Sequence, residues 1–201
     1  MYILCSDLEG VFVPEIWIDV AQTTGIEELK LTTRDISDYD VLMKKRLSIM
    51  AEHNLKLSDI QAVIKKIDPL EGARELLTWI RENYQIIIVS DTFVEFAAPL
   101  MEKLDWPTLF CNSLEVAADG TVTGYKLRQT DGKRKTTQAL QSLNFTVVAF
   151  GDSYNDITML QQADEAFLFR PPANVTEEHP DLAWTKTYAG LKQLIQKATA
   201  Q

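Results

Sequence analysis

The chain has 201 residues, of which 46% are hydrophobic and 24% are charged, and this composition excludes collagen-like, low-complexity and disordered proteins. Its formal net charge of -9 argues against a partner that is nucleic acid or an anionic membrane, because both require clustered Lys and Arg. The apolar start meets Asp7 with no basic segment before it, no apolar run approaches a membrane span, and two cysteines make no disulfide framework. We therefore expect a cytoplasmic protein.

Short apolar clusters alternate with amphipathic stretches along most of the chain. The clusters predicted to be buried strands are Tyr2–Ser6, Gln85–Ser90, Thr108–Cys111, Thr146–Phe150 and Ala166–Phe169. The stretches predicted to be helices are Glu71–Asn83, Val94–Leu104, Lys133–Leu143, Asn155–Ala163 and Tyr188–Ala198. This alternation predicts an α/β fold, a Rossmann-like parallel sheet with helices on both faces.

Two segments depart from the alternation. Residues 14–66 contain helical patterns and no strand, with Pro14 as a first helical residue, Gly25 as a helix end and Ser58 as a helix N-cap. We expect a small helical cap at 14–66, inserted after the first strand of a core formed by residues 1–13 and 67–201. The pair Asp119-Gly120, between Leu114–Ala118 and Thr121–Leu127, predicts an added β-hairpin.

Polar residues follow three of the predicted strands, at the edge where a parallel sheet binds ligands. They are Asp7-Leu8-Glu9 after the first strand, Ser90-Asp91 after the second, and Gly151-Asp152 with Asn155-Asp156 after Thr146–Phe150. Neighbouring strands would place the Asp7 and Asp152 carboxylates side by side, where they repel each other. A hard divalent cation such as Mg²⁺ makes that arrangement tolerable, so the sequence predicts a magnesium site.

Lys133 supplies the positive charge that an acidic protein needs in order to bind a phosphate. Taken separately, Lys133 and Lys135 are each typical of a solvated first helical turn. The polar residues at the strand ends favour Lys133 over its neighbour. A Walker loop is excluded, because Leu127 stands where its first glycine is required and Arg134 follows the lysine.

These pieces, in this order, resemble the motifs of the haloacid dehalogenase superfamily of phosphotransferases. The matched pieces are Asp7-x-acid, Ser90, Lys133 and Gly151-Asp152-x-x-x-Asp156, each on the predicted element. The resemblance implies that Asp7 is a nucleophile forming an aspartyl-phosphate, with Ser90 and Lys133 holding the phosphoryl group. It also implies Mg²⁺ bound by Asp7, Asp152 and the main-chain carbonyl of Glu9.

Within the superfamily, the insertion after the first motif and Asn155 resemble phosphoserine phosphatases. Three segments are most similar to the bifunctional phosphoserine phosphatase/homoserine phosphotransferase group: 7–11, 14–17 and 90–93. This resemblance implies hydrolysis of O-phospho-L-serine, transfer of the phosphoryl group to L-homoserine, and a place in serine and threonine biosynthesis. Glu9 departs from the family's Asp, and it would act as general acid for the leaving oxygen and then as general base.

The cap offers further candidates for substrate binding. Arg46 lies within an apolar helical stripe of Tyr39–Ala51, so it either snorkels, pairs with a buried acid, or awaits an anionic ligand. The resemblance implies that Arg46 binds the substrate carboxylate through two hydrogen bonds. Glu15 is either a dipole-complementing acid of a first helical turn or the partner of the substrate amino group.

Three more residues are candidates for contacts near the phosphate. Asn155 is either a helix N-cap or a substrate contact, and Asp91 is a further substrate-binding candidate. Asp156 is expected to orient Lys133 or a metal-bound water.

Two alternatives remain open from the sequence. One is a phosphatase of the same superfamily that acts on another small phosphoester, for which Arg46 and Glu15 would have no zwitterion to bind. The other is an aspartate-phosphorylated receiver-like signalling domain, which also uses a strand-end Asp, a hydroxyl and a lysine with Mg²⁺. The helical insertion and the length of the chain argue against the second. The sequence leaves the oligomeric state open, with a homo-oligomer as one outcome.

Overall fold

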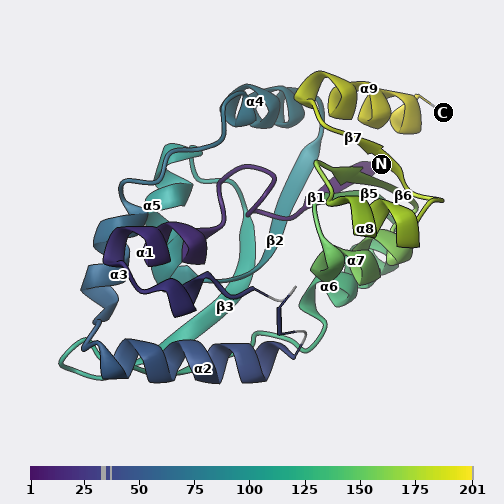
Figure 1. Ribbon diagram of the computed structural model, residues 1–201. Helices are drawn as coiled ribbons and strands as arrows, with labels where there is room; N and C mark the ends of the chain where they lie inside the picture. The colour runs from purple at the N-terminus through teal and green to yellow at the C-terminus, as the bar shows by residue number, and fades with distance from the viewer. Residues whose placement is uncertain (33–34, 37, 201) are drawn as a thin grey trace.

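A computed structural model describes residues 1–32, 35–36 and 38–200, and these contain a seven-stranded, mostly parallel sheet (Figure 1). The strands are β1 (Tyr2–Ser6), β2 (Gln85–Phe93), β3 (Leu109–Val116), β4 (Val122–Lys126), β5 (Thr146–Gly151), β6 (Glu165–Phe169) and β7 (Ala183–Thr185). They lie in the order β4-β3-β2-β1-β5-β6-β7, and β3–β4 is the antiparallel pair. The α/β fold predicted from the sequence is confirmed, with β1 at the centre between β2 and β5.

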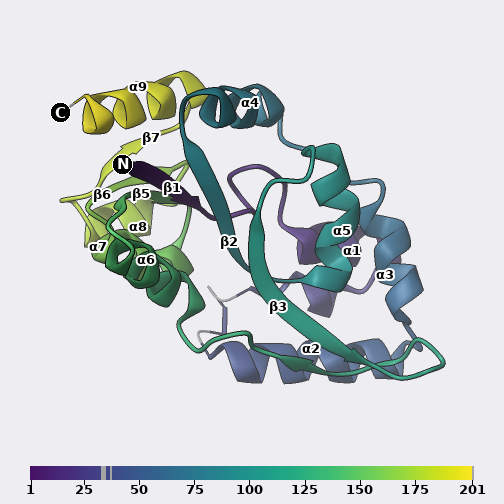
Figure 2. The same cartoon turned by 180° about the vertical axis from the view of Figure 1, so that it is seen from behind.

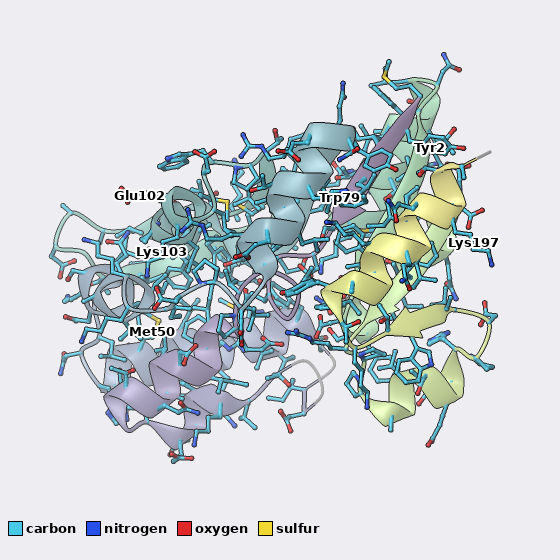
Figure 3. All side chains as sticks on the ribbon, turned by 90° about the horizontal axis from the view of Figure 1, so that it is seen from above. Tyr2, Met50, Trp79, Glu102, Lys103 and Lys197 are labelled. Atoms are coloured by element: carbon cyan, nitrogen blue, oxygen red, sulfur yellow. The ribbon has the colours of Figure 1, made fainter. Side chains whose placement is uncertain are left out.

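Helices cover both faces of the sheet, and an apolar core lies under each. One face carries α4 (Ala73–Asn83), α5 (Val94–Lys103) and α9 (Tyr188–Thr199); the other carries α6 (Gly132–Ser142), α7 (Ile157–Gln162) and α8 (Ala173–Glu178). In Figure 3, α4 and α9 lie side by side near Trp79, whose ring centroid is 4.7 Å from the Lys192 Nζ. None of the helices in the described part of the chain is long and apolar enough to span a membrane.

Helical elements alone connect β1 to α4 in the described residues. They are α1 (Ile16–Thr24), the short 3-10 helix η1 (Glu27–Lys30), α2 (Tyr39–Glu52) and α3 (Leu57–Ile64). Trp17 of α1 packs edge to face on Phe96 of α5, with ring centroids 5.6 Å apart, so this segment shares the apolar core of the sheet. Its division from the rest as a cap of residues 14–66 stays a prediction.

Two predicted helix starts are wrong, and side-chain caps explain both. The first helix begins at Ile16 and not at Pro14, because the Glu9 carboxylate accepts a hydrogen bond from the Ile16 N–H, 2.8 Å away. The α3 helix begins at Leu57 and not after Ser58, because the Asp59 carboxylate accepts from the Lys56 N–H at 2.8 Å. Gly25 does end α1, with a φ of 72°.

The β3–β4 hairpin extends the sheet and contacts α2 at both ends (Figure 2). Two segments expected to be separate, 108–111 and 114–118, form one strand, because β3 pairs first with β2 and then with β4. Near the start of α2, the Tyr125 hydroxyl donates to Asp40 Oδ1 at 2.5 Å. Beyond its end, the Leu57 N–H donates to the Gly120 carbonyl at 2.9 Å. The hairpin therefore holds α2 in place.

Candidate active site

The carboxyl ends of the neighbouring strands β1 and β5 bring three aspartates together. Asp7 follows β1 directly, Asp152 follows β5 directly, and Asp156 lies four residues further on, at the start of α7. One carboxylate oxygen from each lies within 4.8 Å of the others, and all three residues are buried. Three carboxylates at this separation repel each other, so the cluster requires positive charge.

Lys133 supplies part of that charge from the first turn of α6. Its Nζ lies 2.8 Å from Asp7 Oδ2, 2.7 Å from Asp156 Oδ1 and 3.7 Å from Asp91 Oδ2, and the residue is 3% exposed. Burial lowers the pKa of Lys133, but the three carboxylates outweigh burial and hold it well above its ordinary value. Lys133 is therefore a fixed cation beside Asp7.

The Asp156 side chain stabilises the turn after β5 by hydrogen bonds to its backbone. Its Oδ2 accepts hydrogen bonds from the backbone N–H groups of Asp152, at 2.9 Å, and Ser153, at 3.1 Å, while Oδ1 pairs with Lys133. Both carboxylate oxygens are thus engaged, and the side chain is fully buried. Asp156 therefore contacts Lys133 directly, while its expected role, to orient Lys133 or a metal-bound water, stays a prediction.

Asp7 presents its carboxylate to the centre of the site. Oδ1 accepts from the Leu8 N–H at 2.7 Å and Oδ2 pairs with Lys133. Burial and the neighbouring Asp156 raise the pKa of Asp7 well above its ordinary value, and Lys133 opposes them. A further cation between Asp7 and Asp152 would favour the ionised form of both.

The loop after β1 passes directly beside the Asp152 carboxylate. Gly10 has a φ of 74°, and a Cβ added there would lie 2.4 Å from the Asp152 carboxyl carbon. Glycine therefore permits the loop after β1 to pass directly beside this carboxylate. The donors that face the site are carboxylate oxygens of Asp7 and Asp152, which are the hard ligands that Mg²⁺ prefers, so the residues fit this ion.

A cavity of about 80 Å³, called the inner cavity below, opens beside Asp7 and extends towards α1 and α2. The residues that line it are Asp7, Glu9, Glu15, Trp17, Thr32, Tyr39, Leu42, Arg46, Ser90, Asp91, Thr92, Phe93, Asp152, Ser153 and Asn155. The predicted site residues all lie in this lining except two, Lys133 and Asp156. Lys133 contacts both Asp7 and Asp156. The fold therefore gathers the predicted residues in one place.

Arg46 lies in the inner-cavity wall on the α2 side. The residue is 7% exposed, its guanidinium carbon lies 4.6 Å from the Trp17 ring centroid, and Nη2 donates to the Leu31 carbonyl at 2.8 Å. Nε is buried and has no hydrogen-bond partner among the described atoms. Burial lowers the pKa of Arg46 to about 10, which leaves the side chain charged at neutral pH. Arg46 is therefore a buried cation over an indole ring, with one donor that is not used in the described structure.

Glu9 and Glu15 place two acids near Arg46. Burial raises the pKa of Glu9 to about 8, the like charge of Glu15 adds to this effect, and the hydrogen bond from Ile16 opposes it. A carboxyl group with a pKa near neutrality can both donate and accept a proton at physiological pH. This property suits an acid–base role for Glu9.

Asp91 connects several residues around the inner cavity. Asn155 Nδ2 donates to Asp91 Oδ2 at 3.3 Å, and the hydroxyl of Tyr39 donates to the Asp91 carbonyl at 2.9 Å. Ser90 is buried, and its Oγ accepts from the Thr92 N–H at 3.2 Å. Tyr39 was missed as a site residue, although its place on the same helical stripe as Arg46 was a signal that could have identified it.

Comparison with known proteins places the chain in a family. Residues 8–164 match the haloacid dehalogenase-like hydrolases, and the chain belongs to this family of enzymes. It is 54% identical over 201 residues to the phosphoserine phosphatase ThrH of Pseudomonas aeruginosa, covering 100% of this chain and 98% of that protein. It is 27% identical over 175 residues to a phosphoserine phosphatase of Methanocaldococcus jannaschii, covering 80% and 82% of the two chains.

Solved structures share the fold. A substrate-bound phosphoserine phosphatase complex superposes with a TM-score of 0.75 at 22% identity, covering 98% of this chain and 97% of that one. A phospho-aspartyl intermediate analogue of phosphoserine phosphatase gives a TM-score of 0.76 at 23% identity, covering 98% of both chains. The arrangement of sheet and helices is therefore that of the phosphoserine phosphatase structures.

Gly10→Ala tests the close approach of the β1 loop to Asp152. We expect activity to fall about 10–100-fold, the usual effect of disturbing groups around a metal ligand, because the new methyl group displaces the Asp152 carboxylate. Gly25→Ala is the matched control, since Gly25 has a φ of 72° and nothing within 4 Å of an added Cβ. Phosphate release and thermal unfolding are measured for both variants. Equal activity in the two variants would contradict this account of the site.

Proposed function

We propose that the protein hydrolyses O-phospho-L-serine with Mg²⁺, through an aspartyl-phosphate on Asp7, and transfers the phosphoryl group to L-homoserine as a second activity. One observation carries the substrate assignment. The inner cavity joins a phosphate-binding end, with Asp7 and Ser90, to an end with a buried cation and an acid, Arg46 and Glu15. A phosphorylated amino acid has complementary groups: a phosphate at one end, and a carboxylate and an ammonium group at the other.

The transfer to the protein uses Asp7 as the nucleophile. An ionised carboxylate oxygen of Asp7 forms a bond to phosphorus while the bond from phosphorus to the serine oxygen breaks. Lys133, 2.8 Å from Asp7, and the Ser90 hydroxyl stabilise charge on the phosphoryl oxygens. Glu9 in its protonated form gives its proton to the departing oxygen, so that serine leaves as a neutral alcohol.

The second step returns Asp7 to its starting state. A hydroxyl from water or from homoserine attacks phosphorus, and the bond from phosphorus to Asp7 breaks. Glu9, now ionised, takes the proton of the attacking hydroxyl. The raised pKa of Glu9, about 8, supports a role in which the group carries a proton in one step and accepts one in the next.

Asp7, Asp152 and the main-chain carbonyl of Glu9 are the groups that we propose hold Mg²⁺. The ion, when bound, neutralises part of the negative charge on the carboxylates and on the phosphoryl oxygens. The buried cluster of Asp7, Asp152 and Asp156 around a single lysine supports this proposal, because one lysine balances only part of the charge of three carboxylates.

Specificity for phosphoserine is proposed to come from the wall on the helical side. Arg46 would hold the substrate carboxylate, and Glu15 the ammonium group. Asn155 and Asp91, which are hydrogen-bonded to each other, would line the passage between the amino acid and the phosphate. The 54% identity to a protein named phosphoserine phosphatase supports this substrate over a phosphosugar.

Membership of a hydrolase family argues against the receiver-like alternative, because a hydrolase turns over its phosphoryl group. A cytoplasmic location, a role in serine and threonine biosynthesis and the absence of nucleic-acid and membrane partners remain proposals. They rest on the acidic charge and the nature of the proposed substrate.

The proposed activity is tested by incubating the protein with Mg²⁺ and O-phospho-L-serine, with and without L-homoserine. We expect inorganic phosphate in both reactions and O-phosphohomoserine only where homoserine is present, quantified by mass spectrometry. No turnover of phosphoserine would contradict the substrate assignment. Phosphate without phosphohomoserine would contradict the transfer activity alone.

Arg46→Ala tests the carboxylate clamp. We expect kcat/KM for phosphoserine to fall by about 30-fold or more, because removing one partner of a buried charge pair costs about 2–5 kcal/mol. The loss for O-phosphoethanolamine, which has the ammonium group and no carboxylate, is expected to be small. Lys45→Ala, an exposed change on the same helix, is the control and is expected to leave both values unchanged. Equal losses for the two substrates would mean that Arg46 has a structural role.

A further inference from the structure

A second and larger cavity adjoins the active site, on the side of the chain segment between β4 and α6. This outer cavity has a volume of about 700 Å³. The residues that line it are Tyr39, Asp91, Leu127, Gln129, Thr130, Asp131, Gly132, Lys133, Tyr154, Asn155 and Asn174. Three of them, Tyr39, Asp91 and Asn155, also line the inner cavity, so these residues form the partition between the two.

Hydrogen bonds to Asp91 hold the partition together. The Tyr39 hydroxyl donates to the Asp91 carbonyl at 2.9 Å, and Asn155 Nδ2 donates to Asp91 Oδ2 at 3.3 Å. Asn112 Nδ2 also donates to the Asp91 carbonyl, at 3.1 Å. If the Tyr39 hydroxyl moves away, the carbonyl therefore keeps a partner. Opening the partition at Tyr39 breaks this one hydrogen bond and disturbs the edge-to-face contact of its ring with Tyr125, whose ring centroid is 5.9 Å away.

Lifting α2 away from the core would cost far more. The hairpin holds the start of α2 through Tyr125 and Asp40, and holds the segment after it through Lys56, whose Nζ lies 2.8 Å from Asp119 Oδ2. Figure 2 shows α2 running beside the β3 ribbon and the hairpin. Apolar side chains of α2, among them Met43 and Met50, are buried in the core that α2 shares with the sheet. Rotation of one tyrosine breaks none of these contacts.

The chemistry of the outer cavity suits a small amino acid. Tyr39, Leu127 and Tyr154 give it apolar surface, while Gln129 and Thr130 offer neutral polar groups. Both acids in its wall are paired: Asp131 with Arg134, and Asp91 with Lys133, whose Nζ lies 3.7 Å from Asp91 Oδ2. A zwitterion with no large side chain can pass such walls without losing a strong interaction or meeting an unpaired charge.

We propose that the outer cavity is the port through which phosphoserine and its alcohol partners, serine and homoserine, reach and leave the inner cavity, and that Tyr39 is the gate. This inference rests on the proposed function for the identity of the molecules that pass. The gate opens when the Tyr39 hydroxyl leaves the Asp91 carbonyl, and α2 stays on the hairpin. Tyr39 is thus a positioning residue, which closes the site without taking part in the chemistry.

The test places a removable block in the port. Gln129→Cys puts a thiol at an exposed position in the outer-cavity wall, and Leu143→Cys puts one at an exposed position at the far end of α6 as a control. Each variant is labelled through a disulfide with a methyl group or with a bulky aromatic group, and labelling is quantified by mass spectrometry. The native thiols react slowly, since burial raises the pKa of Cys5 to about 12 and of Cys111 to about 11.

We expect the bulky label on Gln129→Cys to lower kcat/KM for phosphoserine at least fivefold relative to labelled Leu143→Cys. The methyl label should have a smaller effect, and a reductant should restore the activity. A loss below fivefold with the bulky label fully attached would overturn the port. If Gln129→Cys does not fold, Leu127→Cys, whose parent side chain is 40% exposed in the same wall, replaces it.

The unlabelled variants separate this inference from the proposed function. They are assayed first with phosphoserine and with p-nitrophenyl phosphate. If phosphoserine is not hydrolysed, the proposed function fails, and the port is then tested with the phosphoester that is turned over. If the bulky label on Gln129→Cys lowers kcat/KM for that phosphoester, the port is supported. If the label leaves kcat/KM unchanged, the port is contradicted.

Discussion

The buried ion pairs of Lys133 are the interaction on which the site depends. One ammonium group lies within 2.8 Å of Asp7 and 2.7 Å of Asp156, and it is 3% exposed. Removing one partner from such a cluster leaves a buried charge without compensation, which costs about 3–5 kcal/mol. The position of β1 between β2 and β5, and the start of α6 next to them, are therefore constrained by electrostatics as well as by apolar packing.

Local charge, and not net charge, explains how an acidic protein can bind a phosphorylated substrate. The chain carries a formal net charge of -9, yet its two buried basic side chains, Lys133 and Arg46, belong to the same site among the described residues. In the proposed function, Lys133 binds the phosphate and Arg46 binds a second anionic group. Each is desolvated, so its interaction with an anion is stronger than it would be on the surface. Glu9 and Glu15 lie near Arg46 and make that end of the inner cavity fit a zwitterion.

The sequence predicted the sheet and the strand-end residues well, because these depend on local patterns. Apolar runs such as 2–6 and 146–150 are buried on both faces and are read directly from the chain. Short exposed elements were missed: β7 is three residues long and α8 has one buried residue, so neither has a periodic apolar pattern. Ser58 was predicted as a cap from its type alone, whereas the Asp59 carboxylate decides where α3 begins. The contact between Tyr39 and the Asp91 carbonyl joins a side chain to a distant backbone atom, and no sequence pattern marks a backbone partner.

The central claim is that Asp7 carries the phosphoryl group, and it is tested most directly by trapping that group. The protein is mixed with ³²P-labelled phosphoserine and Mg²⁺, quenched in acid within milliseconds, digested and mapped by mass spectrometry. The account predicts label on the peptide that contains Asp7, released by hydroxylamine as expected for an acyl phosphate, and no labelled peptide in Asp7→Asn. Label on another residue, or label on Asp7→Asn equal to that on the unaltered protein, would contradict it.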